Sequence, residues 1–169
     1  VSLDAVRAIP TWRADESLFR LLLTLREKSS QEVMVQTRVA QDDLLIYAAR
    51  GATERFHDDE LALRQMLNYP PFATFIFLTW QGSLEHIATT ETELKTLLVA
   101  HENNLQFYTS PHSQPKEPIR HCLIRIPNHR VTTTPLLMAQ PPSSFAILID
   151  QLRHLPPHIT IMINPDRIV

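Results

Sequence analysis

The second half of the chain alternates between apolar runs typical of strands and apolar stripes typical of helices. Runs rich in β-branched and aromatic residues predict strands at 73–80, 105–108, 121–126 and 158–163. Apolar positions at helical spacing predict helices at about 84–100, with Ser83 as its cap, and at 143–154. The order βαββαβ predicts a ferredoxin-like α+β sandwich, in which two helices cover one face of an antiparallel sheet.

The first half favours helices. Apolar residues between Leu18 and Leu25 predict an amphipathic helix with Asp15 in its first turn, and residues 33–37 read as a short strand. Two more helices are expected at 42–50 and 53–67, with Gly51 between them and Thr53 as the second cap.

A sharp corner follows the last of these helices. Asn68 can take the left-handed conformation that ends a helix, and neither Pro70 nor Pro71 can continue it. Phe72 then begins a run that reads as a buried strand. A helix, a proline corner and a core strand are therefore expected in succession.

This corner also carries a family resemblance. The pattern E-L-x-x-R-x-x-L-x-Y-P-P-F resembles the start of the C-terminal domain of the primosomal protein N′ family, the PriA-type replication-restart DNA helicases. The residues that match it are Glu60, Leu61, Arg64, Leu67, Tyr69, Pro70, Pro71 and Phe72.

Two further stretches are similar to the same family. Around Arg13 and Glu16 the pattern P-x-[FW]-R-A-x-E, followed by V-x-[VI]-Q-T at 33–37, resembles the end of the second helicase lobe. The ending at 155–166 resembles the family's terminal strand. The resemblance implies a remnant of helicase lobe 2 at 1–38, a helical connector at 39–67 and a C-terminal domain like ribosomal protein S10 at 68–169.

One departure from the family concerns the ATP site. Family members carry a Gly-Arg-Ala-Gly-Arg segment whose arginines complete that site, whereas residues 25–31 here contain no glycine and form a shorter turn. Arg26 and Lys28 are the basic residues left there. The lobe is therefore interpreted as degenerate or truncated.

Composition narrows the chemistry further. The 169 residues contain two glycines, neither in a phosphate-binding context, and one cysteine, Cys122, which excludes an internal disulfide and a cysteine-rich zinc site. A net charge of −2 gives no global attraction to nucleic acid, so DNA contact requires a local basic patch. Without a signal peptide or a membrane-spanning run, a cytoplasmic location is expected.

The resemblance implies where partners bind. In the family, a segment like Arg-Tyr-Arg-Trp-Gln contacts the acidic tail of single-strand-binding protein, and Arg120-His121 stands here in place of Trp-Gln. A guanidinium can still hold a carboxylate with two hydrogen bonds. The candidate DNA and partner contacts are Lys116, Arg120, His121, Arg125 and Arg130. They can equally be charges that protect a sheet edge from aggregation.

The expected function is DNA replication restart. The resemblance implies contacts with branched or single-stranded DNA, with single-strand-binding protein and with upstream helicase domains. ATP and zinc belong to other parts of the family's chain, so we expect no cofactor, metal or catalytic residue within these 169 residues, and no activity of the chain alone.

Two alternatives come from other functional classes. A free-standing interaction module would bind protein through a sheet edge or the loop at 127–142, and scattered rather than gathered basic residues would favour it. A two-histidine phosphoesterase would need His158, in His158-Ile159-Thr160, to converge with His86 in one cleft, although the threonine after His86 comes one residue late. The eight histidines show no metal-ligand spacing.

Overall fold

The computed structural model describes residues 3–8, 11–39, 41–111, 113–128 and 143–168. The chain divides into two compact units, one made of Val1–Leu67 with Asp166–Val169 and the other of Asn68–Pro165. We refer to them as unit 1 and unit 2. The loop at 127–142, proposed as a docking segment, lies outside the described residues from 129 onward.

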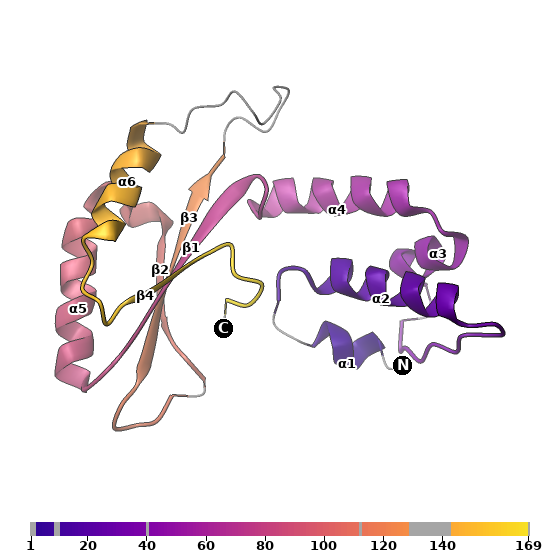
Figure 1. The fold of residues 1–169 in the computed structure, drawn as a ribbon, viewed down its shortest axis with the longest axis horizontal. Coiled ribbons are helices and arrows are strands. Elements are labelled where there is room, and N and C mark those ends of the chain that lie inside the picture. Colours follow the sequence, from indigo (N-terminus) through magenta and orange to yellow (C-terminus); the bar gives the residue numbers. More distant parts are fainter. Residues whose placement is uncertain (1–2, 9–10, 40, 112, 129–142, 169) are drawn as a thin grey trace. The chain divides into compact units, whose positions relative to one another are not determined.

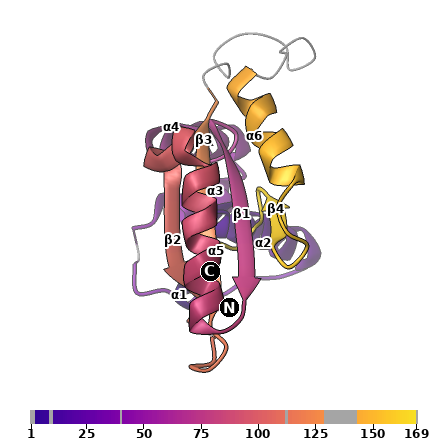
Figure 2. The ribbon, with the colours of Figure 1, turned by 90° about the vertical axis from the view of Figure 1, so that its left-hand side faces the viewer.

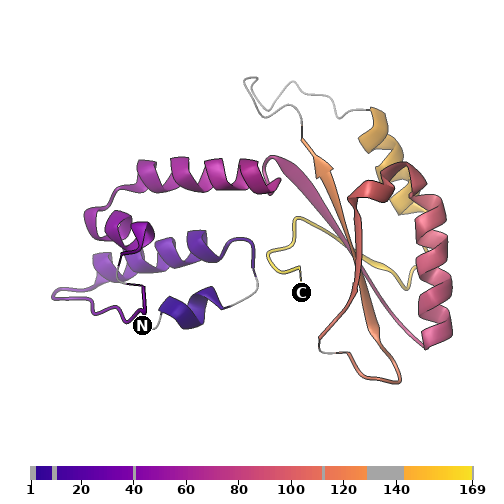
Figure 3. The ribbon, with the colours of Figure 1, turned by 180° about the vertical axis from the view of Figure 1, so that it is seen from behind.

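Unit 1 is helical. Its helices, gathered together in Figure 3, are α1 (Leu3–Arg7), α2 (Ala14–Lys28), α3 (Asp43–Arg50) and α4 (Thr53–Leu67). The Asp42 carboxylate caps α3 by accepting a hydrogen bond from the Leu44 N–H at 3.0 Å, and Gly51, with φ of 68°, ends it. Thr53 is the first helical residue of α4 rather than its cap.

The core of unit 1 joins helices that are distant in sequence. Leu18, Phe19 and Leu22 of α2 pack with Leu44 and Ala48 of α3 and Phe56 of α4, together with Leu3. The Phe19 and Phe56 rings are stacked, with centroids 4.0 Å apart. Residues 1–38 and 39–67 therefore share one hydrophobic core.

Unit 2 is a four-stranded antiparallel sheet with helices on one face. Its elements are β1 (Ala73–Gln81), α5 (Leu84–Leu97), the 3₁₀ helix η1 (Val99–Asn104), β2 (Leu105–Thr109), β3 (Ile119–Pro127), α6 (Ser143–Arg153) and β4 (Thr160–Ile163). The strand order is β2-β3-β1-β4. Both α5 and α6 cover the same face of this sheet (Figures 1 and 2).

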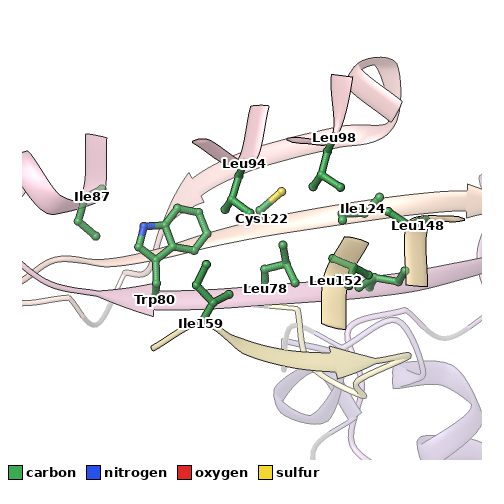
Figure 4. Packing of buried hydrophobic residues seen from close by; sticks show 11 residues of the cluster. Leu78, Trp80, Ile87, Leu94, Leu98, Cys122, Ile124, Leu148, Leu152 and Ile159 are labelled. Atoms are coloured by element: carbon green, nitrogen blue, oxygen red, sulfur yellow. The ribbon is translucent and has the colours of Figure 1, made fainter. Parts of the chain in front are cut away.

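The core of unit 2 lies between that face and the two helices. Ile76, Leu78 and Trp80 alternate along β1 and point to the helices, as the period of a strand requires. They meet Leu94 of α5 and Leu148 of α6 (Figure 4). Trp80, the largest side chain of this core, has 1% of its surface exposed.

The corner before β1 is held by a hydrogen bond from an asparagine side chain. Asn68 takes the left-handed conformation, with φ of 51°, and the Pro70-Pro71 peptide bond is cis. The Asn128 side chain, just after β3, donates to the Pro71 carbonyl at 2.8 Å. Asn164 closes β4 in a similar way, since its side-chain oxygen accepts from the Phe75 N–H at 2.8 Å.

The structure corrects several element boundaries. Residues 33–37 form no strand. Among the described residues, their one strand-like backbone hydrogen bond is donated by the Leu3 N–H to the Gln36 carbonyl at 3.1 Å. Helix α5 ends at Leu97 and the chain tightens into η1, whereas a single helix to about 100 was expected. Strand β4 begins at Thr160, two residues later than expected.

Replacing Leu94 with alanine should destabilise unit 2 by about 2–5 kcal/mol. The leucine is fully buried, so removing most of its side chain loses packing contacts and leaves a cavity. Alanine suits a helix, so the loss reports packing alone. Leu84→Ala on the same helix, where the leucine is 71% exposed, should change stability by less than about 0.5 kcal/mol. Urea unfolding followed by Trp80 fluorescence measures both, and equal effects would contradict the assigned core.

Candidate functional site

A guanidinium network lies at the centre of unit 1. Arg64 of α4 donates through Nη2 to the Glu16 carboxylate of α2 at 2.8 Å, and through Nε to Glu60 one turn earlier at 2.7 Å. Its guanidinium carbon also lies 4.9 Å from the centroid of the Trp12 ring. Two carboxylates and an aromatic face therefore hold one arginine, in the arrangement that suits its planar cation.

A second arginine extends this network to the end of the chain. Arg13 lies over the same Trp12 ring at 4.4 Å and pairs with the Asp166 carboxylate at 3.1 Å. The Thr11 hydroxyl donates to the Asp166 carbonyl at 2.5 Å, and Thr11 forms a β-bridge with Arg167. Residues from all three stretches that carry the family resemblance thus meet in one network.

The electrostatics of the network are coupled. Burial alone would raise the pKa of Glu16, but the hydrogen bond from Arg64 and the nearby charges of Arg64, Arg13 and Arg20 outweigh it and hold that pKa below 4.5. Burial tends to lower the pKa of Arg64, while Glu16 and Glu60 raise it above its ordinary value. Both groups therefore stay ionised around neutral pH.

A cleft opens beside this network. It encloses about 320 Å³ and is lined by polar side chains of Thr11, Arg13, Glu16, Arg20, Asp166 and Arg167. Three guanidinium groups and two carboxylates face it, so the cleft has nearly balanced charge. Such a site suits a ligand that carries both a cationic and an anionic group better than it suits a simple anion.

The last four residues of the corner motif, at 69–72, lie in unit 2. Tyr69 packs edge-on against Phe75, with ring centroids 5.5 Å apart. Pro70 is buried, Phe72 is half-buried, and Pro71 is exposed. The Arg125 guanidinium lies 5.9 Å from the Tyr69 ring and 5.5 Å from the Phe75 ring, so this predicted contact residue is stacked on aromatic rings.

Two other predicted contact residues are engaged inside unit 2. Arg120 donates to the Glu91 carboxylate of α5 at 2.9 Å and to the Thr109 hydroxyl at 2.9 Å. His121 is 7% exposed, lies 3.0 Å through Nδ1 from the Thr79 hydroxyl and stacks on Phe77. Burial lowers the pKa of His121, so its ring is neutral at pH 7.

The structure does not gather the predicted residues onto one face. Successive residues of β3 point to opposite sides, so Arg120 lies on the side covered by α5 while His121 and Arg125 lie on the other. Lys116 is exposed in the loop before β3. Arg130 lies outside the described residues.

The histidines of the phosphoesterase alternative do come together. His86 lies on α5, and its ring centroid is 4.7 Å from that of His158. Both side chains are exposed, whereas a catalytic pair would share a cleft. The hydroxyl of Thr89, the threonine that would assist His86, donates instead to the Glu85 carbonyl at 3.0 Å. These contacts argue against phosphodiester chemistry.

Sequence reasoning found part of the network and missed part of it. The Glu60 and Arg64 positions have the i, i+4 spacing at which helical side chains pair, so that contact is readable from the sequence. The pairing of Arg64 with Glu16 is not, because the two residues lie on separate helices. The contribution of Asp166 was missed for the same reason.

Comparison with known proteins finds relatives that are similar to about half of the chain. No protein-family model matches the chain. The "Replication restart protein PriA" of Borreliella burgdorferi is 28% identical over 93 residues, which cover 52% of this chain and 14% of that protein. The protein of the same name from Chlamydia trachomatis is 29% identical over 95 residues, 53% of this chain and 13% of that protein. The chain contains a partial PriA-like region.

The PriA-like region is only a fraction of the relatives. The matched residues span about one seventh of each PriA protein. Within the described ranges of the chain, no helix combines the length and apolar character that crossing a membrane requires. No three or more His, Cys, Asp or Glu side chains cluster as metal ligands among those same residues.

Replacing Arg64 with alanine should cost about 1.5–3 kcal/mol of stability, because two half-buried carboxylates lose a charged hydrogen-bond donor. Arg20→Ala is the matched control. Its arginine also pairs with Glu16 but is 77% exposed, so the change should cost less than about 1 kcal/mol. Urea unfolding of unit 1 checks both values, and a silent Arg64→Ala variant would contradict the network.

The lowered pKa of Glu16 predicts a pH dependence. A carboxylate whose pKa is lower in the folded than in the unfolded chain contributes stability above 4.5, and this contribution is lost as the pH falls through the folded value. The stability difference between the native chain and Glu16→Gln should therefore be largest near pH 7 and shrink below pH 4.5. Unfolding at several pH values tests this, with Glu27→Gln, an exposed position on the same helix, as control. A difference independent of pH would refute it.

Proposed function

We propose that this chain acts in DNA replication restart, as a part of a PriA-type protein that holds DNA and partner proteins and does not hydrolyse ATP. The observation that carries the proposal is the network of unit 1, in which Arg13 and Glu16, Glu60 and Arg64, and Asp166 come from three separate PriA-like stretches and meet around Trp12. The similarity to two PriA proteins supports it.

The hydrogen bonding of Arg26 supports the part of this proposal that excludes ATP hydrolysis. Arg26 stands where PriA-type helicases place arginines of the ATP site, and its Nη1 donates to the Ala48 carbonyl at the end of α3, at 3.4 Å. A side chain at Gly51 would come within 2.7 Å of that same nitrogen. The guanidinium thus caps a neighbouring helix through one of its N–H donors, which is a structural role for this residue.

We infer that unit 2 is a ferredoxin-like domain of the kind that the S10-like resemblance implies. The observed order of strands and helices after Asn68 and the sheet order β2-β3-β1-β4 support this inference. The face of the sheet opposite α5 and α6 carries Arg125, which is partly exposed, and His121, which is 7% exposed. Arg125 is therefore the residue of this face that we propose to contact DNA or single-strand-binding protein, because His121 is buried.

The proposed contacts differ in how readily they form. Lys116 is exposed and can meet a phosphate directly. Arg130, which lies outside the described residues, is proposed as a second phosphate contact. Arg120 can hold the carboxylate of a partner's acidic tail only if Glu91 releases it, because Glu91 occupies two of its donor groups. Upstream helicase domains and a cytoplasmic location belong to the same proposal.

A protein-interaction module without a DNA role is the second candidate. The observation that favours it is the separation of Arg120 from His121 and Arg125 on opposite sides of the sheet, since a DNA-binding surface normally gathers its positive charge on one face. The net charge of −2 points the same way.

Titration of a labelled forked DNA, followed by fluorescence anisotropy at several salt concentrations, tests the proposed function. Binding should weaken as salt rises, and Lys116→Ala should reduce the slope of log K against log salt by about one unit, the value for one lost phosphate contact. The double variant Arg120→Ala, Arg125→Ala should weaken binding further. Lys28→Ala, an exposed lysine on α2, is the control of equal charge and should leave binding unchanged.

No binding of the forked DNA at low salt would remove the DNA role and favour the interaction module. The next titration would then use a labelled acidic peptide that ends in an aromatic residue, with the same variants. Loss of peptide binding in the Arg120 variant alone would assign the tail contact to that guanidinium.

A further inference from the structure

We propose that His86 and His158 form a surface binding site for a transition-metal ion with a preference for imidazole, such as Zn²⁺, Ni²⁺ or Cu²⁺. The site lies wholly in unit 2 and is independent of the proposed role in replication restart. It joins the first turn of α5 to the turn before β4.

The separation of the rings fits shared coordination. Imidazole nitrogens bind such ions at about 2.1 Å, so two rings on one ion with ordinary bond angles have centroids roughly 4.5 to 5.2 Å apart. The observed centroid distance is 4.7 Å, and the ring planes are inclined by 56°, which is not a parallel stack. The pair therefore already has the spacing of two ligands before any ion is bound.

Backbone geometry holds His86 in this position. A Cβ at Gly82 would lie 2.7 Å from the His86 Cδ2, so the ring occupies space that only a glycine leaves open. The Ser83 hydroxyl accepts a hydrogen bond from the His86 N–H at 3.2 Å and fixes the first turn of α5. One of the two glycines of the chain thus gives room to this ring.

His158 is held just as locally. It lies in the turn between Pro157 and the buried Ile159, whose N–H donates to the Pro156 carbonyl at 3.0 Å. Because Ile159 is anchored in the core of unit 2, the residue before it has little freedom to move away. Both ligands are therefore pre-positioned, which reduces the entropy lost when an ion binds.

The ring nitrogens of the pair are available. Among the described residues neither imidazole takes part in a hydrogen bond, and both side chains are exposed. The one thiol does not compete for the ion, because Cys122 is fully buried and burial raises its pKa to about 12. With two protein ligands, water completes the coordination, so the ion is exchangeable.

An ion at this site should stabilise unit 2. The two ligands lie on different elements and are far apart in the unfolded chain, so the ion binds the folded state preferentially and shifts the unfolding equilibrium. Mg²⁺ and Ca²⁺ prefer oxygen ligands and should have no such effect.

Calorimetric titration of the full 169-residue chain with NiCl₂ and ZnCl₂ at pH 7.5, beside MgCl₂, is the experiment that tests the proposal. We expect one equivalent of Ni²⁺ or Zn²⁺ to bind and to raise the melting temperature, and Mg²⁺ to do neither. His86→Gln and His158→Gln should each weaken binding at least about tenfold, since even loss of an outer partner of a metal ligand commonly costs that much.

His57→Gln is the matched control, because His57 is also an exposed helical histidine but lies in unit 1. It should bind as the native chain does. Substoichiometric Ni²⁺ should also broaden the imidazole NMR signals of His86 and His158 before those of the other histidines. Broadening spread evenly over all of them, or equal affinity in the two site variants and the native chain, would overturn the proposal.

Discussion

A half-buried guanidinium must be paired, and this requirement determines how unit 1 is assembled. Arg64 is 12% exposed, so its charge is tolerated only because Glu16, Glu60 and the face of Trp12 surround it. Those partners come from α4, α2 and the segment before α2. The packing of Phe19 on Phe56 brings the same two helices together, so the apolar core and the ionic network position each other.

The network also explains why residues with a family resemblance need not be catalytic. Arg13 and Arg64 share one aromatic ring, and each reaches a carboxylate from a different part of the chain. Such an arrangement fixes relative positions within unit 1 and performs no reaction itself. Arginine and glutamate side chains that match a family pattern can therefore serve to hold a fold together.

Local patterns predicted local structure well. The strands and helices of unit 2 follow their apolar periods to within a few residues, because β1, β3, α5 and α6 each place one face on the core around Trp80. The cap at Ser83 and the helix end at Gly51 were predicted from residue type, whereas the cap at Asp42 was not predicted and Thr53 is not a cap. Periodicity failed at 33–37, where no strand among the described residues lies alongside the strand-like run to complete its hydrogen bonds.

Contacts between residues that are distant in the chain could not be predicted from the sequence. Nothing local pairs Arg64 with Glu16, engages Arg120 with Glu91, or brings His86 to within 4.7 Å of His158. Each depends on which faces of two elements meet, and a single sequence does not report this. The predicted basic residues of β3 illustrate this limit. Side chains that are adjacent in the sequence point to opposite faces of the sheet, because side chains alternate along a strand.

The way in which β4 ends has a consequence for the behaviour of unit 2 at high concentration. This strand lies at an edge of the sheet, and its four residues, Thr160–Ile163, are exposed and mostly apolar. Edges of that kind invite pairing with another chain, and many proteins prevent it with charged side chains. Here the left-handed Asn164 and then Pro165 end the strand after four residues, so an incoming strand finds too short a ladder to bind. Protection from aggregation therefore depends on the brevity of the strand instead of its charge.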